Sequence, residues 1–125
     1  MSLKVLLTLS GGLEASAGAA ALIAPALVIT VLLGVPAESA SVVLARFFGI
    51  GILSLGVAAL QARHDTESRA GISVAYAMTC YNLVAAVLLI WAVSVVGLGG
   101  LILWVAGLGH AMLGGVFLHV LLQGG

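Results

Sequence analysis

The feature that most constrains this chain is the scarcity of charge along four long apolar stretches. Its 125 residues include only four Lys or Arg and four Asp or Glu, and 63% of them are hydrophobic. A soluble domain carries about 25% charged residues, so charge this sparse cannot give a globule of this size a water-compatible surface. We therefore expect lipid to surround most of the chain, as in a multi-pass membrane protein.

Apolar length predicts where the chain crosses the membrane. A helix needs roughly 20 apolar residues to cross the ~30 Å hydrocarbon layer. Four stretches reach that length, and we expect helices at about 3–33, 38–62, 71–96 and 101–122. The first is long enough to tilt and carries Pro25 as a kink. Joined by short connections, they predict an all-α fold, an antiparallel four-transmembrane-helix bundle that forms one domain over residues 1–125.

The flanking charges predict the orientation of this bundle. Lys4, Arg63 and Arg69 all fall at the end that holds both termini and the polar loop RHDTESR, residues 63–69. The opposite end has Glu38 and neither Lys nor Arg in its loops. Because Lys and Arg favour the cytoplasmic side, we expect a multi-pass inner-membrane protein with its N- and C-termini in the cytoplasm.

Each predicted helix places one strongly polar residue inside the membrane, and these residues are Glu14, Arg46, Asn82 and His110. At 1.5 Å per residue, Glu14 lies about 15 Å from Lys4, close to the middle of the bilayer. A charged side chain there costs about 3 kcal/mol even on a lenient scale, so we expect all four to face inward and find partners. Tyr81 adds a weaker polar group on the third helix.

Small residues surround these polar side chains. Ser10, Gly11 and Gly18 lie one turn from Glu14. Small residues let helices approach closely, and here we also expect them to leave room around the polar heads. Glu14 and Arg46 differ by about 10 Å in height along the bundle. This difference leaves space between them for a water or a ligand.

Three classes of function remain open from the residues alone. The first is a binding or accessory module that holds a small amphipathic ligand or a partner membrane helix, because convergent polar groups in an apolar cavity are typical of ligand sites. We expect that site to comprise Glu14, Arg46, Asn82, His110 and Tyr81. The second is a small proton-coupled transporter, because an acid in the membrane near a histidine can relay protons.

The third class is an intramembrane enzyme that uses Glu14 or His110 as a general acid–base, although no second catalytic element is visible. A purely structural membrane subunit, in which the same side chains fix helix register, is the alternative to all three.

No motif for a cofactor or a metal appears, and zero net charge without a basic cluster argues against nucleic-acid binding. Because the small-residue faces of the first and fourth helices exceed what one bundle needs, we expect a homo-oligomer in the lipid bilayer.

Two families resemble this pattern. The segments LSGGLEASAG, VLARFFGIGILSLGVAALQAR, CYNLVAAVL and GLGHAML occur in a layout similar to that of small four-helix bacterial membrane proteins of unknown function, the DoxX-like families. That resemblance implies an inner-membrane bundle and transfers no functional residue. The chain also resembles the small multidrug resistance transporters, whose single glutamate in the first helix exchanges protons for a cationic drug. Glu14 matches that position, whereas Arg46 has no counterpart and the glycine motif of their third helix is absent.

Overall fold

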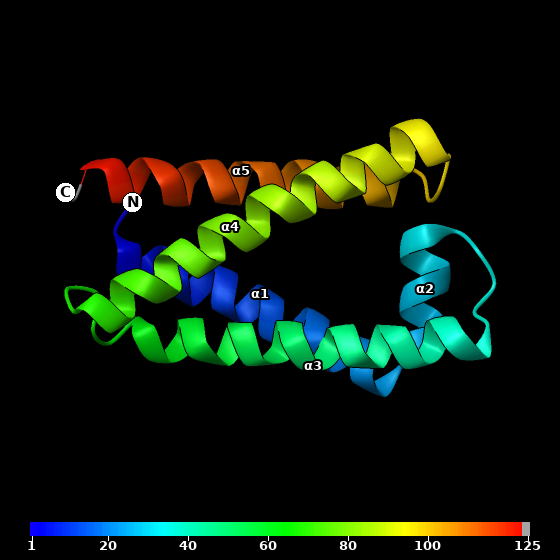
Figure 1. The fold of residues 1–125 in the computed structure, drawn as a ribbon, viewed down its shortest axis with the longest axis horizontal. Helices are drawn as coiled ribbons and strands as arrows, with labels where there is room; N and C mark the ends of the chain where they lie inside the picture. Colours follow the sequence, from blue (N-terminus) through cyan, green and yellow to red (C-terminus); the bar gives the residue numbers. More distant parts are fainter. Residues whose placement is uncertain (124–125) are drawn as a thin grey trace.

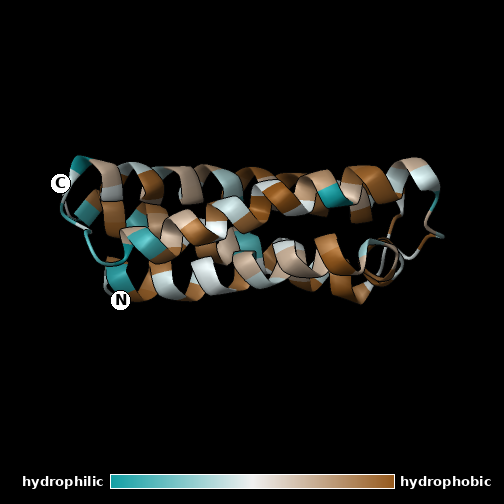
Figure 2. Cartoon of the chain, turned by 90° about the horizontal axis from the view of Figure 1, so that it is seen from below, coloured by the Kyte–Doolittle hydropathy of each residue, from teal (hydrophilic) through white to brown (hydrophobic). Residues whose placement is uncertain are grey.

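The computed structural model describes residues 1–123, and the secondary structure in that range is entirely helical (Figure 1). Its elements are α1 (Leu3–Ile23), α2 (Pro25–Leu33), α3 (Ser39–Ala62), α4 (Arg69–Trp91), the π-helical turn η1 (Ala92–Val96) and α5 (Leu101–Gln123). Four helices are long and apolar enough to cross a membrane, namely α1, α3, α4 with η1, and α5. In Figure 2 the hydrophilic colours gather at the end that holds the termini. The expected all-α fold with four candidate spans is confirmed.

The first predicted helix is not continuous over 3–33, because the chain breaks at Ala24. This residue has φ −130° and ψ 57°, and Pro25 begins α2 as its first helical residue. Proline lacks a backbone N–H and disfavours the α conformation in the residue before it, so the sequence breaks the helix here instead of only kinking it. The 21 residues of α1 are about 31 Å long, which is enough to cross the hydrocarbon layer alone.

The chain of α2 is not needed to complete the first span. It lies across the end of the bundle that is remote from the termini (Figure 1). It ends at Gly34, which has φ +69°. Directly before that glycine, the Leu33 carbonyl accepts a hydrogen bond from the backbone N–H of Gly99 at 2.6 Å. A side chain on Gly99 would meet the Leu32 carbonyl, so only glycine fits. The C-terminal end of α2 is thereby tied to the loop that precedes α5.

The helices pack as two antiparallel hairpins, α1 with α3 and α4 with α5. Glycines let α1 and α3 meet backbone to backbone. A methyl group on Gly18 would collide with the Leu53 backbone nitrogen, and one on Gly56 would collide with the Ala15 backbone nitrogen. Such close approach is the usual reason for small residues between membrane helices.

The two hairpins pack most closely at the end that holds the termini. There α4 begins beside α3, and it then crosses obliquely to finish beside the far end of α5 (Figure 1). A fully buried cluster fills this end, made of Leu6, Leu7, Ala59, Ala75, Met78 and Phe117. The hairpins are therefore sealed by side chains near the termini, and the bundle is held at its other end by α2.

Candidate binding site in the membrane interior

Three of the predicted polar residues meet between the hairpins, each from a different helix. Glu14 of α1 is 3% exposed and Asn82 of α4 is completely buried, while His110 of α5 is partly buried. His110 Nδ1 lies 2.8 Å from Asn82 Oδ1 and 4.0 Å from Glu14 Oε1. Glu14 is therefore within ion-pair range of the imidazole but too far away for a direct hydrogen bond.

Asn82 determines which imidazole nitrogen carries the proton. Its Nδ2 donates to the Met78 backbone carbonyl at 2.8 Å, so the amide orientation is fixed and Oδ1 faces His110 as an acceptor. The Nδ1 of His110 must then be the donor. This leaves Nε2 of a neutral His110 with its lone pair free to accept a hydrogen bond.

Tyr81 joins the same group from the position next to Asn82. Its ring meets the His110 ring edge-on, with centroids 5.5 Å apart and an interplanar angle of 85°. The Tyr81 hydroxyl is also close enough to the Glu14 carboxylate to interact with it. Edge-to-face contact is the favourable geometry for such rings, so Tyr81 holds the imidazole on one side and reaches the carboxylate on the other.

Two further buried polar residues line the helices that bear the site. Thr79 donates to the Ala75 carbonyl of its own helix at 2.8 Å. Ser10 is fully buried, and its hydroxyl has no hydrogen-bond partner among the described residues. It lies four residues before Glu14 and so shares its helix face. From the sequence, Ser10 was predicted only to be a small residue beside Glu14. Its spacing of four residues from Glu14 already indicated that its hydroxyl would face the site.

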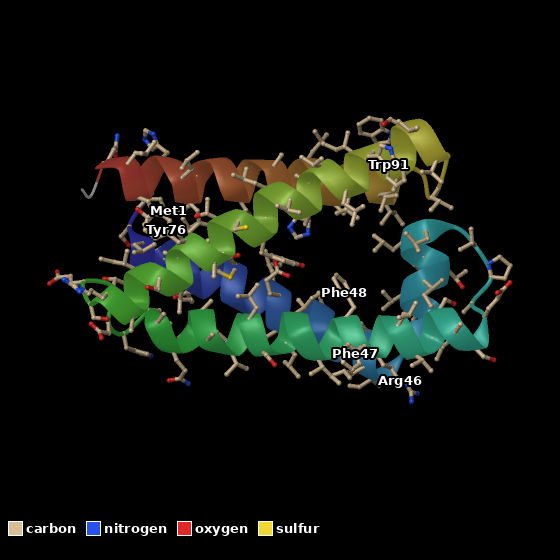
Figure 3. The ribbon with its side chains drawn as sticks, in the orientation of Figure 1. Met1, Arg46, Phe47, Phe48, Tyr76 and Trp91 are labelled. Atoms are coloured by element: carbon tan, nitrogen blue, oxygen red, sulfur yellow. The ribbon has the colours of Figure 1, made fainter. Side chains whose placement is uncertain are left out.

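Arg46 does not join these residues, contrary to the sequence prediction. It is exposed, and Figure 3 shows its side chain directed away from the α4–α5 hairpin. The buried face of α3 is defined by Gly49, Ile52, Gly56 and Ala59. Continued by one turn, that spacing reaches Ala45, so Arg46 is rotated by about 100° from it. The expected pairing or bridging of Glu14 with Arg46 is absent.

The glycines near the polar residues also have another role than the one expected. Gly11 and Gly18 do not leave room around Glu14, because both pack against the backbone of α3. On α5, Gly107 packs against Ile90 and Gly114 against Leu83. These glycines bring the helices of each hairpin together. The site thus lies where the two closely packed hairpins face each other.

Comparison of the chain with protein-family models, with curated proteins and with solved structures finds no match. The class of protein is therefore defined by the fold and the site alone. It is an α-helical protein with four candidate membrane spans, and a carboxyl, an amide, an imidazole and a phenol gather within its interior.

Proposed function

We propose that this protein is a membrane-embedded binding module whose site, formed by Glu14, Asn82, His110 and Tyr81, holds the polar head of a small amphipathic molecule. The observation that carries the proposal is the environment of Glu14. Its buried carboxyl has no Lys or Arg beside it within residues 1–123, and its nearest basic group is the His110 imidazole, 4.0 Å away. An uncompensated carboxyl inside a membrane calls for a partner.

The chemistry of the site favours a neutral or cationic head group. Glu14 accepts hydrogen bonds when ionised, Nε2 of neutral His110 accepts one, and the Tyr81 hydroxyl both donates and accepts. Because Arg46 lies outside the site, no Lys or Arg among residues 1–123 is beside Glu14 to attract an anion. Amines and alcohols on an alkyl chain fit this set, and carboxylates do not.

The proposed setting is the bacterial inner membrane, with both termini in the cytoplasm. Lys4, Arg63 and Arg69 lie at the end of the helices that holds the termini. In the loops at the other end, Glu38 is the only charged residue. This asymmetry supports the orientation.

Assembly into a homo-oligomer is also part of the proposal. Gly11 and Gly18 already contact α3 of the same chain. An interface between subunits would therefore use unoccupied positions such as Gly115, where an added methyl group would meet nothing within 4 Å among the described residues.

Ligand-induced stabilisation tests the binding function. The purified protein is melted in detergent with an alkylamine, an alkanol or an alkanoate of equal chain length. We expect the amine and the alcohol to raise the melting temperature with a saturating dose dependence, and the alkanoate to have no such effect. Glu14→Gln should abolish the effect of the amine, and Arg46→Gln, the matched control outside the site, should preserve it. Equal responses of all three compounds, or no response, would contradict the proposal.

Proton-coupled transport is a second candidate because two titratable groups, Glu14 and His110, lie 4.0 Å apart within the membrane region. A pair of this kind can exchange a proton with a ligand or with water. The discriminating experiment uses proteoliposomes that enclose a pH-sensitive dye. Alkylamine-dependent proton flux that Glu14→Gln abolishes would favour transport, whereas binding without flux favours the module.

A further inference from the structure

The two hairpins separate within one turn of α3. Ile52 is 6% exposed, whereas Phe48 is 58% exposed. These residues are four apart and therefore share a helix face. Figure 3 shows the Phe48 side chain pointing from α3 toward the α4–α5 hairpin. Its exposure marks a space between the hairpins that the described side chains leave uncovered.

This space lies near the buried site along the bundle axis. Gly49, next to Phe48, packs against Gly18 and Ala21 of α1. Because Gly18 is one turn from Glu14, Phe48 lies about two turns, or roughly 10 Å, from Glu14 along the helix. At the far end α2 contacts both α3 and α5. The space at Phe48 therefore opens sideways, toward the lipid around the bundle.

The other approach to Glu14, from the end that holds the termini, is filled by side chains. Leu6, Leu7, Met78 and Phe117 are all completely buried there. A ligand coming from water at that end would have to displace this cluster. A ligand already dissolved in the membrane can approach from the exposed side of Phe48 without displacing this cluster.

We propose that the ligand enters sideways from the lipid at Phe48, and that its alkyl tail rests against Phe48 while its head group reaches Glu14. The inference rests on the proposed function and names one occupant, a single-chain amphiphile with an amine or hydroxyl head. Two observations select this occupant. The residues that face the opening, Phe48 and Ile52, are apolar, and the carboxyl beyond them lacks a cationic partner among residues 1–123.

Contact quenching tests this placement, because binding affinity does not report tail contact when lipid and protein are equally apolar. The full chain with Trp91→Phe and Trp104→Phe receives either Phe48→Trp or the matched control Phe47→Trp. Phe47 is 77% exposed and turned about 100° from Phe48, so both sites accept the larger ring. The probe is an alkylamine that is brominated at the end of its chain, because bromine quenches tryptophan fluorescence on contact.

We expect a saturable loss of fluorescence from the Phe48→Trp variant, which excess unbrominated alkylamine reverses and Glu14→Gln removes. The Phe47→Trp variant should show only the gradual, non-saturating loss caused by probe dissolved in the detergent. If the alkylamine still raises the melting temperature but both variants quench alike, the sideways route is wrong and the proposed function stands. If the alkylamine does not stabilise the unmodified protein, both proposals fail.

Discussion

Asn82 fixes the His110 imidazole from across the α4–α5 hairpin, with its Oδ1 2.8 Å from His110 Nδ1 and its Nδ2 bonded to the Met78 carbonyl. Replacing Asn82 with Leu leaves the imidazole N–H without its acceptor in a buried setting. We expect a loss of about 1–3 kcal/mol in the free energy of unfolding. Reversible unfolding in mixed detergents measures this loss. Thr79→Val is the control, because Thr79 is buried nearby but bonds only within its own helix. An equal loss in both variants would contradict the role of the Asn82–His110 contact.

The proximity of Glu14 to His110, 4.0 Å apart where the expected partner was Arg46, predicts which substitutions are coupled. Glu14→Gln and His110→Gln should show a coupling energy of about 0.5–3 kcal/mol in a double-mutant cycle, as contacting residues do. Glu14→Gln and Arg46→Gln should be additive within about 0.5 kcal/mol, because they share no contact. Unfolding of the single and double variants in the same detergent mixture gives both values. Coupling to Arg46 instead of His110 would show that the site is assembled differently.

The backbone contact between α1 and α3 predicts a position-specific intolerance of side chains. Gly18→Ala and Gly56→Ala each place a methyl group against a backbone nitrogen of the facing helix, and we expect each to cost about 1–3 kcal/mol as overpacking. Gly12→Ala and Gly51→Ala, on the same two helices, meet nothing within 4 Å among the described residues and should be neutral or slightly stabilising. Melting temperatures of the four variants make the comparison. Similar losses at all four positions would mean that helix packing is not responsible.

Topology can be measured independently of the site. A reporter fused after Asp65 should be active if it requires the cytoplasm and inactive if it requires the periplasm, and fusions after Gly34 and Gly99 should behave in the opposite way. The expectation follows from Lys4, Arg63 and Arg69 at one end of the bundle. Periplasmic activity of the Asp65 fusion would reverse the proposed orientation.

Apolar length was enough to predict four helical spans, because burial in lipid demands it whatever the detailed packing. It could not predict that α1 ends at Ile23, since the residues of α2 are as apolar as those of a span. Pro25 marked the position of the break, but the angle that follows depends on the tie between Leu33 and Gly99. That contact joins segments far apart in the sequence.

For the site, residue counting gave depth along the membrane and left the direction of each side chain open. Glu14, Asn82 and His110 lie together in the structure, within the membrane interior where the predicted helices place them. The direction of Arg46 could not be predicted in this way, because its height is compatible with either face of α3. The seven-residue spacing of Gly49 and Gly56 indicated which face of α3 contacts α1. If this glycine face is taken as the line of closest helix contact, Arg46 lies away from it and points out of the interior.

The arrangement as two hairpins also indicates how the protein can be taken apart. Each hairpin makes its closest contacts within itself, and the polar loop 63–69 is the covalent connection between them. We expect residues 1–65 and 66–125, produced as two separate polypeptides in one cell, to recombine in the membrane and restore the site, because Glu14 comes from the first piece and Asn82 and His110 from the second. Neither half carries the complete set of polar groups. Ligand recognition by this protein would then be a property that exists only when its halves meet.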